Sequence, residues 1–235
     1  MARQTFFFVA GEVMAILKEE RIGGQRLILG DCLQVMPLLG KFDAVVTDPP
    51  YGIGAAKMSL GKWVSSRLSK KEWDAKTPDL SFLPSVPSIV WGGNYFPLPP
   101  ARAFLVWDKG AGFKGRDFAE CEMAWCSFDA NARIFSYDPL AKGDYRRRVH
   151  KTQKPVALME WCLGFLPKAQ TILDPFMGSG TTLVACQKLG RNGTGIELDP
   201  DYFDIACKRV DEATRQVDLF IAPPPPQATQ EGFDI

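Results

Sequence analysis

The stretch Asp48-Pro49-Pro50-Tyr51 combines residue types that could do chemistry on a flat ring bearing an amino group. It follows the run 42–47, which is short, largely apolar and rich in β-formers, and so predicts a buried parallel strand. Ligands bind at the carboxyl ends of such strands, where Asp48 lies. Two successive prolines hold the chain extended and leave the carbonyls of Asp48 and Pro49 free to accept hydrogen bonds. A carboxylate, a fixed carbonyl and an aromatic ring together suit the NH₂ group of a nucleobase.

A second stretch, from Asp174 to Thr182, has the pattern of a cofactor-binding turn. It begins where the predicted strand 171–173 ends, and its Gly178-Ser179-Gly180 turn leads into a predicted helix at 183–189. Glycines let the backbone approach a ligand closely, and the free N–H groups at a helix start favour a carboxylate or phosphate. The next predicted strand, 192–196, ends in Glu197, whose carboxylate can accept both hydrogen bonds of a ribose diol. Together these features indicate an adenosine-type cofactor.

A third motif, Thr152-Gln153-Lys154-Pro155, opens a predicted helix that ends near residue 166. In this order the three motifs resemble those of the S-adenosylmethionine-dependent DNA amino-methyltransferases (adenine-N6 and cytosine-N4), in the permuted arrangement where the Asp-Pro-Pro-Tyr motif precedes the cofactor motif. The resemblance covers about residues 27–210. It implies a Rossmann-like α/β fold with a seven-stranded, mostly parallel sheet and helices on both faces. The runs 122–127 and 132–137 predict an antiparallel hairpin at the edge of that sheet.

The resemblance also implies roles for cofactor-pocket residues. Asp31 would recognise the adenine, although its place between a strand and a helix fits a helix N-cap equally well. The glycine turn would hold the methionine part of the cofactor, and Glu197 the ribose. The implied cofactor residues are Asp31, Asp48, Gln153, Lys154, Asp174, Phe176, Gly178, Ser179, Gly180, Thr181, Thr182 and Glu197.

The predicted catalytic residues are Asp48, Pro49, Pro50 and Tyr51. Asp48 and the carbonyl of Pro49 would accept the two amino hydrogens, while Tyr51 would stack on a base that has left the duplex. By analogy with the family, aspartate at the first motif position favours adenine N6, since serine usually accompanies cytosine. Cytosine-N4 methylation and a non-catalytic DNA-binding module of this fold are the alternatives. A nicotinamide-dependent oxidoreductase is disfavoured, because the turn lacks the third glycine of the dinucleotide fingerprint.

The amino-acid composition excludes several other classes of protein. A chain of 235 residues with 46% apolar content can bury a full core and predicts one domain. The formal net charge of +1 gives no overall nucleic-acid signature. Six scattered cysteines and a single histidine predict neither a metal site nor disulfides, and indicate reduced thiols in the cytoplasm. The apolar run 6–17 is interrupted and too short to span a bilayer, so we expect no export.

The predicted domain organisation is a leader at 1–24, the methyltransferase domain at 25–217 and a proline-rich tail at 218–235. Two regions, 55–80 and 110–150, are candidates for contact with duplex DNA because their basic side chains could neutralise phosphates. Solvated faces of no special function would have the same composition. The candidate DNA contacts are Lys57, Lys62, Arg67, Lys70, Lys71, Arg146, Arg147 and Arg148.

The predicted partners are double-stranded DNA and a second copy of the chain in a homodimer. Members of the family can be restriction-modification partners or stand-alone enzymes, and the sequence does not separate the two. Residues 216–220 also resemble the Gln-x-x-Leu-Phe peptides by which bacterial replication proteins dock on the sliding clamp, through Gln216, Leu219 and Phe220. Alternatively, the apolar pair packs against the sheet as the last turn of a helix.

Overall fold

The computed structural model describes residues 15–53, 77–116, 118–144, 149 and 153–217. Over these residues the structure has nine strands, four α-helices and three short 3₁₀ turns labelled η. In chain order the elements are β1 (Ile16–Ile22), β2 (Gln25–Gly30), α1 (Cys32–Val35), η1 (Met36–Leu38), β3 (Ala44–Thr47), β4 (Ser88–Trp91), η4 (Gly93–Tyr95), β5 (Phe104–Asp108), η5 (Ala111–Phe113), β6 (Cys121–Cys126), β7 (Arg133–Ser136), α3 (Val156–Gly164), β8 (Thr171–Asp174), α4 (Thr181–Lys188), β9 (Asn192–Glu197) and α5 (Pro200–Val217).

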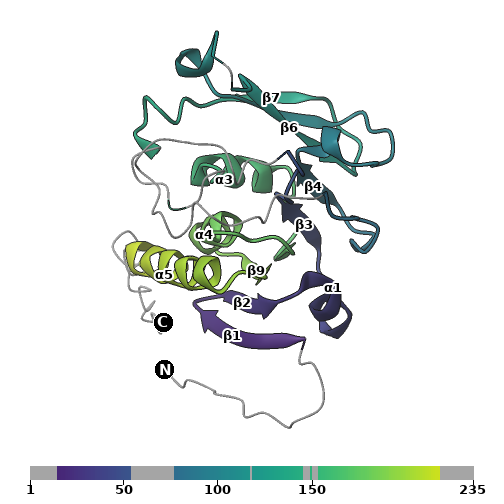
Figure 1. Cartoon of the computed structure of the whole chain (residues 1–235), viewed down its shortest axis with the longest axis vertical. Helices are drawn as coiled ribbons and strands as arrows, with labels where there is room; N and C mark the ends of the chain where they lie inside the picture. The colour runs from purple at the N-terminus through teal and green to yellow at the C-terminus, as the bar shows by residue number, and fades with distance from the viewer. Residues whose placement is uncertain (1–14, 54–76, 117, 145–148, 150–152, 218–235) are drawn as a thin grey trace, which may run out of the picture.

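One mixed sheet organises these elements, with the strand order β1-β2-β9-β8-β3-β4-β6-β5-β7 (Figure 1). The five strands from β2 to β4 are all parallel. β6 runs antiparallel to both neighbours, β4 and β5, and β7 runs parallel to β5. The α/β class and the mostly parallel sheet are confirmed. The carboxyl ends of β2, β3, β8 and β9 therefore meet along one edge of the sheet, which is where a ligand is expected.

The edge hairpin and the strand number differ from the prediction. The two runs that became β6 and β7 do not pair with each other, because β5 lies between them. The antiparallel edge hairpin is at the opposite end of the sheet, where β1 turns through Gly23-Gly24 into β2. β1 belongs to the stretch assigned to a leader, so part of that leader is an edge strand. Within the described residues the sheet has nine strands where the resemblance implied seven.

Helices cover both faces of the sheet. Successive side chains of β2 point to opposite faces, and the apolar ones need a helix to pack against on each face. Leu27 packs with Leu183 of α4 and Phe203 of α5, on the face where α3, α4 and α5 form a column in Figure 1. Its neighbour Ile28 points to the other face and packs with Val35 of α1. Because successive side chains of a strand point to opposite faces, α1 lies on the face of the sheet opposite to α3, α4 and α5.

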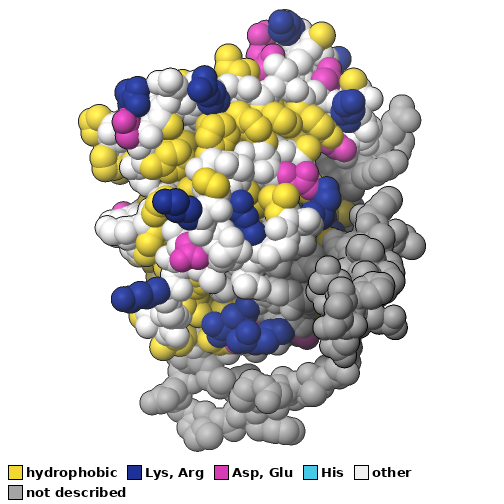
Figure 2. Space-filling view, turned by 180° about the vertical axis from the view of Figure 1, so that it is seen from behind, with side chains coloured by type: hydrophobic (Ala, Val, Ile, Leu, Met, Phe, Trp, Pro, Cys, Tyr) yellow, Lys and Arg dark blue, Asp and Glu magenta, His cyan; other side chains and the backbone are white. Residues whose placement is uncertain are grey.

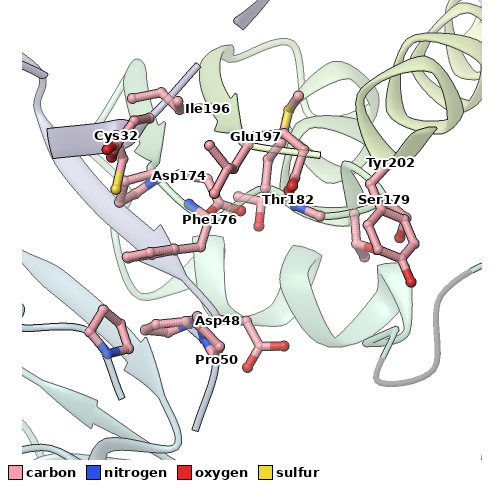
Figure 3. Close-up of a pocket in the computed structure, with 18 of the residues that line it drawn as sticks. Cys32, Asp48, Pro50, Asp174, Phe176, Ser179, Thr182, Ile196, Glu197 and Tyr202 are labelled. Atoms are coloured by element: carbon pink, nitrogen blue, oxygen red, sulfur yellow. Dashed lines mark hydrogen bonds between the residues drawn. The ribbon is translucent and has the colours of Figure 1, made fainter. Parts of the chain in front are cut away.

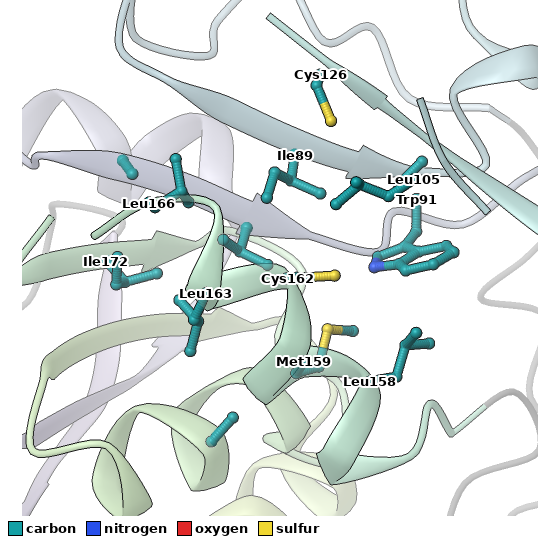
Figure 4. Close-up of a cluster of buried hydrophobic side chains, with 14 of the residues drawn as sticks. Ile89, Trp91, Leu105, Cys126, Leu158, Met159, Cys162, Leu163, Leu166 and Ile172 are labelled. Carbon is teal, nitrogen blue, oxygen red and sulfur yellow. The ribbon is translucent and has the colours of Figure 1, made fainter. Parts of the chain in front are cut away.

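The largest buried cluster lies between α3 and the centre of the sheet (Figure 4). Leu158, Cys162 and Leu163 of α3 are fully buried against it, and so are Ile89 and Trp91 of β4. Burial of large apolar side chains is the main favourable contribution to folding. This packing fixes the start of α3, and hence the motif that precedes it, relative to β4 and β3.

Several predicted contact residues lie outside the described ranges. These are all eight candidate DNA contacts, Leu219 and Phe220 of the clamp motif, and the side chain of Gln216. On the face shown in Figure 2, Lys and Arg side chains are scattered, and hydrophobic side chains cross the upper part, at the level of β5 to β7. Met123 of β6 and Ile134 of β7 are among the exposed large hydrophobic side chains. Among the described residues, no helix is long and apolar enough to cross a membrane, and no cluster of His, Cys, Asp and Glu could hold a metal ion.

Candidate active site

A cavity of about 350 Å³ opens at the carboxyl ends of β2, β3, β8 and β9. Its lining includes all four predicted catalytic residues and every predicted cofactor residue except Gly180. In the view of Figure 3, Phe176 lies between Asp48 on one side and Glu197 on the other. Three sequence motifs that are far apart in the chain thus share one cavity. The lining also includes Pro78, Asp79, Phe82, Leu198 and Tyr202, which the sequence did not single out.

The glycine turn between β8 and α4 adopts backbone angles that favour glycine. Gly178 and Gly180 have φ of 51° and 77°. A Cβ atom on Gly180 would lie 2.9 Å from the Cβ of Ala206, so Gly180 serves the close packing of this turn on α5 rather than lining the cavity. Arg209 of α5 braces the same turn, donating to the carbonyl of Ser179 at 2.6 Å and to the Oγ1 of Thr181 at 3.1 Å.

Glu197 ends β9 next to this turn. Its carboxylate accepts hydrogen bonds from the backbone N–H of Gly178 at 2.9 Å and of Asp199 at 2.8 Å. Burial raises the pKa of Glu197 to about 7, against the lowering effect of these backbone donors. Each oxygen keeps a second acceptor position, so an ionised Glu197 can still accept from two hydroxyl groups.

Asp174 lies at the end of β8 and turns its carboxylate toward β3. It accepts from the hydroxyl of Thr47 at 2.7 Å and from the backbone N–H of Phe176 at 3.2 Å. Burial raises its pKa to about 6, although hydrogen bonds from Thr182 and Thr47 act against this. Asp174 therefore ties the glycine turn to the strand that carries Asp48.

Asp31 combines the two alternatives that the sequence left open. Its side chain caps α1 by accepting from the backbone N–H of Leu33 at 2.9 Å. It also lines the cavity. Gln153, in contrast, uses its side-chain oxygen to accept from the backbone N–H of Val149 at 3.0 Å, although the residue lines the cavity too.

The carboxylate of Asp48 is already engaged by two donors. The ammonium of Lys154 lies 2.6 Å from its Oδ2, and the hydroxyl of Tyr51 donates to its Oδ1 at 2.5 Å. Lys154 is almost fully buried, with 3% of its side chain exposed, and also lies 3.0 Å from Glu122. Burial raises the pKa of Asp48, opposed by the attraction of Lys154. Lys154, a predicted cofactor residue, lines the cavity, and its ammonium contacts the carboxylate of Asp48.

The ring of Tyr51 is held by aromatic packing. It stacks on Tyr95 with 4.9 Å between ring centroids and 14° between planes. A Cβ atom on Gly92 would lie 2.1 Å from the ring, so only glycine leaves room for Tyr51 there. Tyr95 therefore covers one face of the Tyr51 ring.

Glu122 and Lys109 are functional candidates that motif reasoning missed. The ammonium of Lys109 lies 2.6 Å from Glu122, and Lys109 is itself buried. The signal was available in strand alternation: Glu122 shares a face of β6 with Ala124 and Cys126, both fully buried. A carboxylate at an inward position needs a cationic partner, and that requirement predicts a buried ion pair.

A protein-family model and known relatives match the sequence of this chain. A family model described as DNA methylase (N6/N4) matches residues 90–208. The type II methyltransferase M.ScaI of Streptomyces caespitosus is 26% identical over 77% of this chain and 80% of its own length. M.HpaI of Haemophilus parainfluenzae is 42% identical over 28% of this chain, a match that spans only 21% of that protein.

Among solved structures, the fold is similar to that of the M1.HpyAVI–SAM complex. The TM-score is 0.50 at 21% sequence identity, covering 80% of this chain and 99% of that one. At this identity the match supports the fold alone, while the family model covers half of the chain. On that match, the chain belongs to the N6/N4 DNA methylase family, the S-adenosylmethionine-dependent enzymes that methylate amino groups of DNA bases.

Proposed function

We propose that this DNA methylase transfers a methyl group to the exocyclic N6 of an adenine flipped out of double-stranded DNA. One observation supports the proposal most: Asp48, at the end of β3, shares a cavity with the glycine turn and with Glu197. A group that can accept amino hydrogens is thereby placed next to a site suited to an adenosine-type cofactor. Pro49 and Pro50 line the same cavity.

The residues present fit S-adenosylmethionine. A Cβ atom on Gly178 would meet no other atom within 4 Å, so the turn leaves open space where a ligand could approach the backbone. Glu197 would accept the ribose hydroxyls, the hydroxyls of Ser179 and Thr181 would donate to the carboxylate of the methionine part, and Phe176 offers an aromatic surface to the adenine. The cavity volume is in the range typical of small-molecule sites, about 300 to 1,000 Å³.

Methyl transfer requires mainly that the protein position the amino group of the base next to the methyl group of the cofactor. When bound, S-adenosylmethionine supplies an electrophilic methyl group. The lone pair of an aromatic amine is delocalised into its ring, which makes the nitrogen a weak nucleophile. Asp48 and the Pro49 carbonyl, by accepting both hydrogens at about 3 Å, would favour the pyramidal and more reactive form. Holding the reacting groups in line can contribute roughly 7 to 11 kcal/mol.

The choice of adenine rests on Asp48 at the first motif position, by analogy with the family. Purified protein should therefore put labelled methyl groups from S-adenosylmethionine on adenine in polymerase-copied DNA, which carries no methyl groups beforehand. Mass analysis of the digested nucleosides measures this directly. We expect N6-methyladenine. Finding only N4-methylcytosine would show that the substrate base is cytosine rather than adenine. A non-catalytic module would show no methylated nucleoside and no calorimetric binding of S-adenosylmethionine.

Cofactor affinity should depend on pH through Glu197. Its pKa in the folded protein is about 7 because of burial. The ionised form is the better acceptor for ribose hydroxyls, so affinity should be full above pH 7 and fall as pH drops through that value. We expect about a tenfold weaker Kd at about pH 6 than at about pH 8, since the ionised fraction changes by that factor. Calorimetric titration with S-adenosylhomocysteine measures it, and Glu197→Gln, which cannot ionise, should remove the pH dependence.

Double-stranded DNA follows as the partner, and the eight candidate basic contacts remain part of this proposal. A homodimer and docking of residues 216–220 on a sliding clamp also remain proposals. A pull-down with purified clamp, comparing the intact chain with a variant carrying Leu219→Ala and Phe220→Ala, tests the latter. Equal retention of both forms would contradict clamp docking.

A further inference from the structure

Four charged side chains form a continuous buried chain that ends at Asp48. The ammonium of Lys109 lies 2.6 Å from Oε1 of Glu122, and Lys154 bridges Oε2 of Glu122 at 3.0 Å and Oδ2 of Asp48 at 2.6 Å. They come from four places: the residue after β5, the interior of β6, the residue before Pro155 and the end of β3. Two ammonium groups balance two carboxylates, so the chain is neutral as a whole.

The two carboxylates hold Lys154 unequally. Lys154 donates hydrogen bonds to Oδ2 of Asp48 and, at 3.1 Å, to the hydroxyl of Tyr51. Toward Glu122 it makes an ion pair at 3.0 Å that lowers the pKa of Glu122 as a hydrogen bond does, although its geometry leaves the buried Oε2 without a well-directed donor. A buried acceptor without a donor is costly and uncommon in folded proteins. Glu122 therefore offers an open acceptor position 3.0 Å from the ammonium that occupies Asp48.

This arrangement weakens Asp48 as an acceptor for as long as Lys154 donates to it, even though each of its oxygens keeps a second acceptor position. An ammonium that donates to Asp48 competes with the amino hydrogens of the base for the same carboxylate. We propose that Glu122 is a positioning residue for methyl transfer: it takes the hydrogen bond of Lys154 when Asp48 binds the amino group of the base. The exchange needs only rotation about the terminal bonds of Lys154, since both carboxylates are within reach. This inference rests on the proposed function of Asp48.

The neighbouring ammonium groups keep Glu122 ionised, so that it can accept a hydrogen bond. Burial opposes its ionisation, but the charges of Lys154 and Lys109 outweigh burial and lower its pKa to about 2. The charge of Glu122 in turn acts to raise the pKa of Asp48, as burial does, while Lys154 and the Tyr51 hydroxyl act to lower it. Asp174, behind the site, also interacts electrostatically with Asp48.

Glu122→Gln tests the exchange with little change in side-chain shape. The amide is a weaker acceptor for Lys154 and carries no charge, so the ammonium should stay on Asp48. We expect the single-turnover methylation rate to fall about tenfold or more, with the Kd of S-adenosylhomocysteine within about twofold. In the plot of rate against pH, the acid limb should move to lower pH by about half a unit or more. The reason is that the loss of a negative charge near Asp48 lowers the pKa of Asp48. Polymerase-copied genomic DNA serves as the substrate.

The high-pH plateau of the rate profile distinguishes the exchange of Lys154 between carboxylates from a mere shift in the pKa of Asp48. At high pH Asp48 is ionised in both proteins, so a lower plateau reports the ammonium held on Asp48 rather than a change in protonation. Glu120→Gln is the matched control, because Glu120 is exposed and its carboxylate accepts from the N–H of Gly115, away from Lys154 and Asp48. It should behave as wild type. A Glu122→Gln protein with a wild-type plateau, or with an unmoved acid limb, would overturn the proposal.

Two further measurements keep the test decisive. If Glu122→Gln does not fold, Glu122→Asp replaces it: the charge is kept but the acceptor is moved back, so the acid limb should stay in place while the plateau falls. An unchanged plateau would overturn the proposal in that case as well. If wild type itself methylates no adenine or cytosine, the proposed function fails, whereas wild-type activity with an insensitive Glu122 refutes the exchange alone.

Discussion

Replacing Asp48 with alanine is expected to reduce methyl transfer by about a thousandfold. The carboxylate lies at the end of β3 inside the cavity and is the acidic group that faces the predicted position of the amino group. Without it, the nitrogen loses its charged acceptor and the base loses a fixed orientation. The cofactor should still bind with a Kd within about threefold of wild type, because the glycine turn and Glu197 belong to β8, β9 and their following turns. Single-turnover rates and calorimetry measure the two quantities separately.

The folded state should survive this substitution, because Lys154 keeps Glu122 as its counter-charge at 3.0 Å. Asp129→Ala is a suitable control: Asp129 is an exposed carboxylate that pairs with Arg102 and does not line the cavity. That variant should methylate DNA at the wild-type rate. Loss of cofactor affinity parallel to the loss of rate in Asp48→Ala would mean that Asp48 acts mainly in cofactor binding.

The elements that carry the motifs were predictable because their signals are local. Short apolar runs followed by a polar turn define β3 and β8, whereas β9 was predicted from its place about 20 residues after the glycine turn; each of these strands delivers one predicted side chain to the cavity. Asp48, Asp174 and Glu197 are adjacent in space because parallel strands end at the same edge. The sequence order of motifs and the rules for such sheets were sufficient for this part of the site.

The order of the strands at the far edge was not predictable in the same way. β6 and β7 are short and close in sequence, and consecutive strands usually pair, which favoured a hairpin. The structure instead inserts β5 between them, because Leu105 and Trp107 of β5 share the inward face with Ala124 of β6 and with Phe135 of β7. Burial of these larger side chains against α3 outweighs the shorter connection.

The buried ion-pair chain was missed for a different reason. Motif reasoning assigned Lys154 to the cofactor because the resemblance placed it there. Its contacts depend on Glu122, which lies on β6 and reaches Lys154 only through the tertiary fold. Sequence shows that an inward-facing acid needs a partner, but it does not show which cation supplies it. The pairing is a property of the strand order, and strand order was the least predictable part of the fold.

The largest effect on stability is expected from Lys154→Met. Methionine fills a similar volume, so the substitution mainly removes the charge that Asp48 and Glu122 share. Glu122 keeps Lys109 at 2.6 Å, and Asp48 becomes the carboxylate without a cation. Removing one partner from a buried ion pair typically costs about 3 to 5 kcal/mol, and we expect the free energy of unfolding at about pH 8 to fall by that amount. Urea denaturation measures it.

The loss should depend on pH with a definite sign. Burial raises the pKa of Asp48 already in wild type, and without Lys154 the folded-state pKa should rise further. A carboxyl group whose folded pKa exceeds its unfolded value costs no stability while protonated, and the cost grows as pH rises above the unfolded pKa of about 4. The difference between variant and wild type should therefore shrink at about pH 5. Lys168→Met, at an exposed position, should match wild type at both pH values. A loss in Lys154→Met that is equal at both pH values would show that lost packing, rather than the unpaired carboxylate, destabilises the variant.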